Sequence, residues 1–118
     1  MEDYLLNWKE KKEVISQLKS LNFDSLRINT HFYNKWGHPR HGVTIEKARD
    51  VFLKFDKIEQ IFTRQGFGGK RYSVVYRLNK RKGYYLIFLL DNKPKELFDA
   101  FFFSGDVQKR LVRKNLGC

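Results

Sequence analysis

Four segments in the second half of the chain are rich in β-branched and aromatic residues, and short polar turns separate them. They are KIEQIFT (57–63), KRYSVVYRL (70–78), YYLIFLL (84–90) and LFDAFFF (97–103). Enrichment of this kind, with side chains alternating along the segment, is typical of β-strands. Connections this short join antiparallel neighbours, because parallel strands need a long crossover. The sequence therefore predicts a meander of four antiparallel strands.

Two amphipathic helices are expected before this sheet, and a basic helix after it. Residues 3–21 repeat apolar side chains, Trp8 among them, near helical spacing, and residues 45–55 follow Thr44, a good helix N-cap. Residues 104–115, SGDVQKRLVRKN, read as a short closing helix. At 118 residues the chain has the size of one domain. We predict a single α+β domain over residues 1–118, with two N-terminal helices, a four-stranded antiparallel sheet and a short basic C-terminal helix.

The chain is strongly basic, and its positive charge is concentrated. Lysine and arginine number 24 against 13 acids, a formal net charge of +11, and residues 25–45 and 64–82 contain no acid. Charge of this sign indicates a polyanionic partner, and we predict RNA, with aromatic rings available to stack on its bases. The candidate nucleic-acid-binding residues are Tyr33, Trp36, Arg40, Lys70, Tyr72, Lys80, Arg81, Lys82, Lys109 and Arg110. For the turn NKRKG taken alone, a solvated hairpin tip is an equally good interpretation.

The sequence gives no indication of a membrane or of an oxidising compartment. Its one cysteine, Cys118, leaves no intrachain disulfide to form. The N-terminus is charged too early for a secretory signal, and YYLIFLL is far too short to span a bilayer. We expect a soluble, cytoplasmic protein without a membrane partner.

All three histidines lie in one basic stretch, HFYNKWGHPRHGV, at residues 31–43. His31, His38 and His41 are spaced so that a three-imidazole metal site is conceivable. Zinc sites usually recruit cysteine or carboxylate ligands, however, and this stretch has neither. Its cationic surroundings also disfavour a dication, so we expect no metal and no cofactor.

Cationic surroundings suit RNA cleavage without a metal. That reaction needs a base for the 2′-hydroxyl proton, an acid for the departing 5′-oxygen and fixed positive charge for the transition state. Histidine can serve as either proton-transfer group. The candidate catalytic residues are His41, His31, Arg71, Arg77 and Ser104, with Tyr33 or Tyr72 as further phosphate contacts. The alternative is that His41 only seats the start of the second helix, and that His38 is an exposed loop residue.

RHGVTIEKARDVF, at residues 40–52, resembles the BrnT-type toxins, in which a basic residue, His-Gly and a capped helix ending in Val-Phe precede a four-stranded sheet. The wider order of His31, KRYSVVYRL, YYLIFLL and FDAFFFSGDVQKRL is similar to nuclease domains grouped with barnase, EndoU, colicin and RelE toxins, including phage-borne versions. Together the resemblance covers residues 31–113.

The resemblance implies a RelE- or barnase-like fold and a metal-independent ribonuclease of toxin type, with its active site on the open face of the sheet. His41 then matches the family histidine, Arg71 or Arg77 the basic residue of the central strands, and Ser104 or Lys109 the polar position after the last strand. A toxin of this type also implies an acidic antitoxin or immunity protein as a partner. The aromatic last strand favours an alternative, a non-catalytic nucleic-acid-binding or regulatory protein of a phage or plasmid.

Overall fold

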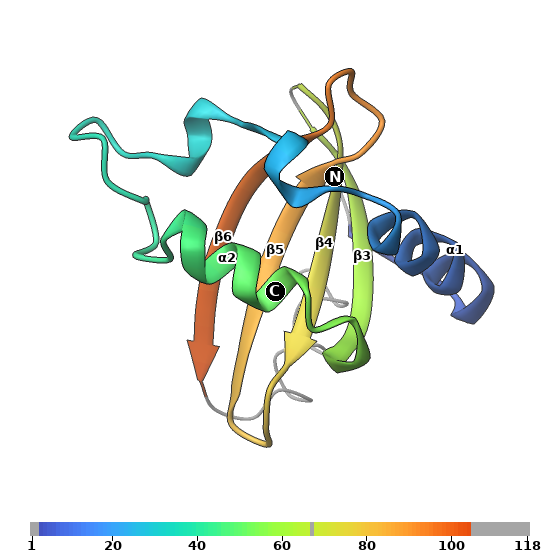
Figure 1. Ribbon diagram of the computed structural model, residues 1–118. Coiled ribbons are helices and arrows are strands. Elements are labelled where there is room, and N and C mark those ends of the chain that lie inside the picture. Colours follow the sequence, from blue (N-terminus) through green and yellow to red (C-terminus); the bar gives the residue numbers. More distant parts are fainter. Residues whose placement is uncertain (1–2, 67, 105–118) are drawn as a thin grey trace.

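The computed structural model describes residues 3–66 and 68–104, which form one mixed β-sheet with helices on one of its faces (Figure 1). The strands, with their bounds, are β1 (Tyr4–Leu5), β2 (Arg27–Ile28), β3 (Ile58–Gly66), β4 (Gly69–Arg77), β5 (Lys82–Leu89) and β6 (Glu96–Ser104). The helices are α1 (Trp8–Lys19) and α2 (Ile45–Phe52), and three short 3-10 turns lie at Phe23–Ser25, Thr30–Phe32 and Phe55–Lys57. The α+β class is as predicted.

The predicted four-stranded antiparallel sheet is wrong in strand number and direction. The sheet has six strands in the order β1-β3-β4-β5-β6-β2, and β2 runs parallel to β6. The central meander of β3 to β6 is antiparallel, as the short connections require. Both added strands are only two residues long, too short to show an alternating pattern in the sequence. The predicted closing helix at 104–115, with Lys109 and Arg110, lies outside the described residues beyond Ser104.

Local capping chemistry sets where the two helices begin. The Asn7 side chain accepts a hydrogen bond from the Glu10 backbone amide, and the Glu10 carboxylate accepts one from the Asn7 amide, so α1 starts at Trp8. The Thr44 hydroxyl accepts from the Lys47 amide and starts α2 as predicted. Helix α1 is shorter than the predicted 3–21, and Trp8 is 72% exposed where burial was expected.

Apolar side chains pack on both faces of the sheet. The larger cluster lies between the helices and the sheet and includes Leu18, Phe52, Tyr76 and Phe88. On the opposite face, Val75 belongs to a smaller cluster with Phe62, Tyr85 and Phe103. The face of β4 that carries Arg71 and Arg77 is therefore not wholly cationic, because it is apolar at its centre.

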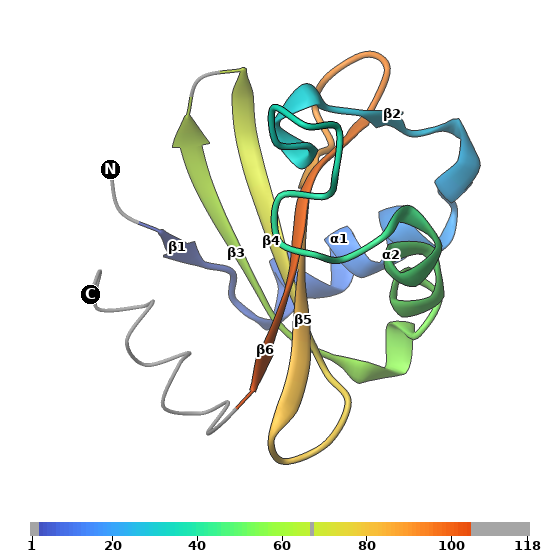
Figure 2. The same ribbon diagram turned by 90° about the vertical axis from the view of Figure 1, so that its left-hand side faces the viewer.

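The chain between Ile28 and α2 extends past the β6 edge of the sheet (Figures 1 and 2). Strand β2 and the turn at Thr30–Phe32 lie against β6, where the Asn29 amide donates to the Leu97 carbonyl at 2.9 Å. The histidine stretch is thus brought to the last strand of the sheet. No helix in residues 3–66 or 68–104 is long and apolar enough to cross a bilayer.

Candidate active site

A β-bulge in β6 sets the position of Asp99. Leu97 pairs with Phe88 and Asp99 pairs with Ile87, so Phe98 has no partner residue on β5. Leu97 and Ala100 consequently both join the helix-side core, while Phe98 and Asp99 between them do not. A bulge changes which side chains share a face, and bulges often lie next to functional sites. Here the bulge leaves the Asp99 carboxylate among the apolar residues of β6, with its side chain only 6% exposed.

A chain of polar contacts starting from β6 holds His31. The His31 backbone amide donates to the Asn29 side-chain oxygen at 2.8 Å, and the Asn29 side-chain amide donates to the Glu96 carboxylate, also at 2.8 Å. This hydrogen bond from Asn29, a second from Asn92 and the charge of Arg27 lower the pKa of Glu96, against an opposing effect of burial. Glu96 therefore fixes Asn29, which in turn fixes the turn that carries His31.

Arg40 joins the segment carrying His41 to the segment carrying His31. Its guanidinium donates from Nε to the His31 carbonyl at 3.0 Å and from Nη2 to the Tyr33 carbonyl at 3.1 Å. Its backbone amide donates to the Phe32 carbonyl. Arg40 was predicted to contact nucleic acid. In the structure its side chain joins the two segments, and His41 follows it directly in the sequence.

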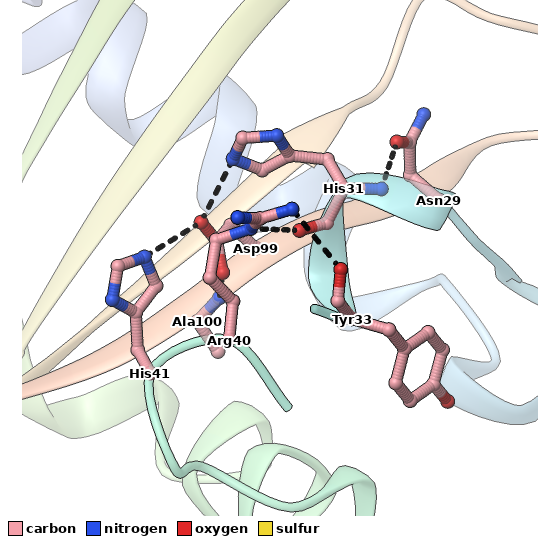
Figure 3. Close-up of polar contacts among 7 residues, drawn as sticks. All are labelled: Asn29, His31, Tyr33, Arg40, His41, Asp99 and Ala100. Atoms are coloured by element: carbon pink, nitrogen blue, oxygen red, sulfur yellow. Dashed lines mark hydrogen bonds and ion pairs between the residues drawn. The ribbon is translucent and has the colours of Figure 1, made fainter. Parts of the chain in front are cut away.

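His31 and His41 converge on the same carboxylate oxygen, approaching it from two sides (Figure 3). Nε2 of His31 lies 3.3 Å from Oδ2 of Asp99, and Nε2 of His41 lies 3.2 Å from the same atom. The other oxygen, Oδ1, accepts a hydrogen bond from the Ala100 amide at 2.8 Å. Both imidazoles are 43% exposed, so the buried carboxylate orients two rings that remain open to solvent. We call His31, His41 and Asp99 the histidine cluster.

Aromatic contacts connect the histidine cluster to Arg71. The His31 imidazole stacks on the Phe98 ring, with 4.4 Å between centroids and 10° between planes. The Arg71 guanidinium carbon also lies 4.4 Å from the centre of the Phe98 ring, so imidazole and guanidinium are at most twice that distance apart. His41 packs less closely against Phe101, at 5.3 Å.

Arg71 is held in an unusual environment for a cation. No carboxylate of residues 3–66 or 68–104 lies within ion-pair distance of it, and its buried Nε has no hydrogen-bond partner in that part of the chain. Arg64 faces it directly across the β3–β4 ladder. Its side chain fills space left by Gly66, where an added Cβ would lie 3.0 Å from Nε. Buried unsatisfied donors and directly opposed like charges are both unfavourable, and a bound anion would offset them.

Several predicted site residues lie away from the histidine cluster. Arg77 is at the far end of β4, about 20 Å from Arg71 at the usual rise per residue, and its Nε is ion-paired with Glu59 at 3.2 Å. Ser104 ends β6, five residues beyond Asp99. Lys80, Arg81 and Lys82 belong to the β4–β5 hairpin, at the same end of the sheet as Arg77. The structure therefore does not bring Arg77 and Ser104 together with the histidine cluster.

Tyr72 and Lys70 serve a structural contact on the helix side. The Tyr72 hydroxyl donates to the Asp91 carboxylate at 3.0 Å, and the Lys70 ammonium lies 5.2 Å from the Tyr72 ring centre. Burial, followed by this hydrogen bond, raises the pKa of Tyr72 to about 12. The contact joins β4 to the β5–β6 loop.

Asp99 was not predicted from the sequence. The signal was present, because LFDAFFF places one acid within an apolar strand, and a buried acid needs cationic or hydrogen-bonding partners. Finding those partners required knowing that the histidine stretch returns to β6. The described residues contain no group of three or more histidine, cysteine, aspartate or glutamate side chains arranged to hold a metal ion.

Comparisons with known proteins do not assign this site to a family. No protein-family model matches the chain, and neither curated proteins nor solved structures gave a significant match. The functional argument therefore depends on the geometry of the site itself.

Proposed function

We propose that this protein is a metal-independent endoribonuclease that cleaves RNA by acid–base catalysis at the histidine cluster. The observation that carries the proposal is that two solvent-accessible imidazoles are oriented by one buried carboxylate oxygen, at 3.3 Å and 3.2 Å. A pair of positioned proton-transfer groups is what transesterification of RNA requires. The strongly basic chain and its acid-free segments support a polyanionic substrate.

In the proposed reaction the two rings take different roles, one as base and one as acid. Both Nε2 atoms face Asp99, so each ring presents Nδ1 to a substrate. One negative charge balances one imidazolium, and the combination of one charged and one neutral ring leaves the cluster without net charge. The neutral ring accepts the 2′-hydroxyl proton at Nδ1, and the charged ring donates its Nδ1 proton to the leaving oxygen.

The reaction that follows is balanced without a cofactor. The 2′-oxygen attacks phosphorus, the bond from phosphorus to the 5′-oxygen breaks, and the products are a 2′,3′-cyclic phosphate and a 5′-hydroxyl. After cleavage, the histidine that acted as base carries an extra proton and the histidine that acted as acid has lost one. Proton exchange with water then restores both rings. Arg71, which contacts the same Phe98 ring as His31, supplies positive charge for the phosphorane-like transition state.

The test is cleavage of total RNA in EDTA, with sequencing or labelling of the fragment ends. Each of His31→Ala and His41→Ala should lower the rate at least tenfold, because each removes one proton-transfer group. His38→Ala is the matched control, since His38 is in the same stretch but outside the histidine cluster. It should cleave like the parent protein and yield the same cyclic-phosphate ends.

Two results would contradict the proposal. Equal cleavage by the parent and both cluster variants would assign the activity to another group or to a contaminant. RNA binding without cleavage would instead support the non-catalytic nucleic-acid-binding alternative, in which the cluster only shapes a basic surface.

A further inference from the structure

Residues 33–39 form a closed loop whose conformation is set by internal hydrogen bonds. A β-bridge joins Tyr33 to Pro39 at its base. Asn34 organises the interior: its amide donates to the His38 carbonyl at 2.8 Å, and its side-chain oxygen accepts from the Trp36 and His38 amides at 2.9 and 3.2 Å. The loop is therefore organised before any ligand binds, and binding need not pay to order it.

Trp36 lies at the tip of this 33–39 loop and is 73% exposed. The Lys35 ammonium lies 5.0 Å from its ring centre, and Lys35 is the nearest charged residue in the sequence. An exposed indole is a large apolar surface left in water, and with cations beside it and no acid in residues 25–45, its surroundings fit an anionic ligand with flat faces. Nucleic acid bases meet that description.

The 33–39 loop and the histidine cluster form one unit. Arg40 ties the loop base to the His31 and Tyr33 carbonyls (Figure 3). In the sequence, His31 and His41 lie on either side of the 33–39 loop, which carries Trp36. The loop projects beyond the β6 edge rather than over the sheet (Figure 1). A strand with one phosphate at the histidines can continue along this projection.

We infer that Trp36 stacks on an unpaired base next to the cleaved phosphate, so that the substrate is single-stranded RNA. In a duplex both faces of each base are covered by neighbours, and the indole has no face to stack on. This inference rests on the proposed ribonuclease function, because the bound RNA is a substrate only if the protein cleaves it. The stacking itself is testable without cleavage.

The experiment measures binding of a fluorescent 2′-O-methyl octanucleotide, which lacks the 2′-hydroxyl and cannot be cleaved. It is compared with the same sequence locked in a duplex, at fixed salt. Trp36→Ala should weaken binding of the single strand about tenfold and binding of the duplex less than twofold. Trp36→Phe, which keeps a ring, should recover most of the affinity.

Trp8→Ala is the matched control, because Trp8 is equally exposed at 72% and has the Lys12 ammonium 5.1 Å from its ring centre, but lies on α1, whose first turn carries the acid Glu10. It should bind both probes like the parent protein. Lys35→Ala should weaken both probes alike, which separates the charge from the ring. Thermal unfolding of each variant confirms that the loop change leaves the fold intact.

Equal losses for single strand and duplex in Trp36→Ala, or no loss at all, would overturn the inference. If the parent fails to cleave RNA but Trp36 discriminates between the probes, the stacking site stands and the ribonuclease proposal falls. If the parent cleaves RNA and Trp36→Ala binds both probes normally, only the stacking inference falls.

Discussion

The two ends of β4 carry the same residue in different surroundings. Arg77 lies by the β4–β5 hairpin, where Glu59 neutralises it at 3.2 Å. Arg71 lies by the histidine cluster, with Phe98 under its guanidinium, Arg64 opposite it and no carboxylate of the described residues within ion-pair distance. Both ends look alike in sequence, since each is rich in lysine and arginine. The two arginines therefore differ in pairing: Glu59 neutralises Arg77, whereas Arg71 has no carboxylate partner among the described residues.

The surroundings of each arginine also determine how much it contributes to stability. The pair of Arg77 and Glu59 is partly exposed, and such pairs contribute about 0–1 kcal/mol to stability. Arg71 instead has a buried Nε without a hydrogen-bond partner among the described residues and lies opposite Arg64, and neither feature stabilises the fold. The comparison can be tested by substituting residues at one end of β4 at a time.

The largest effect is expected from Asp99→Asn. This change keeps the size of the side chain but removes the charge that orients and balances two imidazoles. RNA cleavage should fall by about 100-fold or more, the scale of general acid–base catalysis. Glu59→Gln, on β3 beside the Arg77 end of β4, should change the rate less than about twofold, because surface ion pairs contribute little.

Steady-state cleavage assays with the same RNA and a thermal unfolding curve for each variant make this comparison. A folded Asp99→Asn protein that cleaves as fast as the Glu59→Gln protein would show that the carboxylate is only structural.

Arg71→Gln should have the next largest effect. It removes the guanidinium that contacts the same Phe98 ring as His31, and cleavage should fall about 10- to 100-fold through lost transition-state charge. Arg77→Gln removes the same charge from the chain and should cost no more than about twofold, which excludes net charge as the explanation. Similar losses of cleavage rate in both variants would mean that the two arginines act only through the net positive charge of the protein.

Gly66→Ala refines the same prediction, because its added Cβ would lie 3.0–3.2 Å from three atoms of the Arg71 guanidinium group. It should slow cleavage in the parent protein and have no further effect in Arg71→Gln, since it acts only by displacing Arg71. An equal loss in both backgrounds would place its effect in the hairpin instead.

Local signals in the sequence predicted much of this fold. Helix α2 starts after Thr44, and the four long strands follow the alternating and aromatic segments closely, because caps and side-chain period depend on neighbouring residues. Strands β1 and β2 depend instead on pairing with Phe62 and Leu97, residues far away in the chain. A strand of two residues is too short to show alternating side chains, so neither strand could be predicted from the local sequence.

The candidate site was predictable only in part, for the same reason. His31 and His41 could be selected by residue type, but Asp99 joins them through a bulge at Phe98 that no sequence pattern announces. Arg71 and Arg77 are indistinguishable by spacing, since both lie on one face of β4. Only strand register reveals that Arg71 reaches Phe98 and that Arg77 reaches Glu59.

The smallest expected effect concerns stability at the histidine end of β4, where Tyr72 bonds Asp91. Tyr72→Phe should lower the free energy of unfolding by about 1 kcal/mol near pH 8, the usual net value of a hydrogen bond. Because the pKa of folded Tyr72 is raised from 10.0 to about 12, the unfolded chain loses this proton first as pH rises. The Tyr72 contribution is therefore complete below pH 10 and declines between pH 10 and about 12.

Urea unfolding of the parent and of Tyr72→Phe at pH 8, 10 and 11 measures that decline, because the difference between their free energies of unfolding should become smaller as pH rises. Tyr76, at the other half of β4, donates to the Phe52 carbonyl, and burial raises its pKa as well. It is present in both proteins, so its titration cancels from the difference. If the difference in unfolding free energy stays constant from pH 8 to pH 11, Tyr72 has the same pKa in the folded and unfolded chain. The hydrogen bond to Asp91 would then not retain the Tyr72 hydroxyl proton.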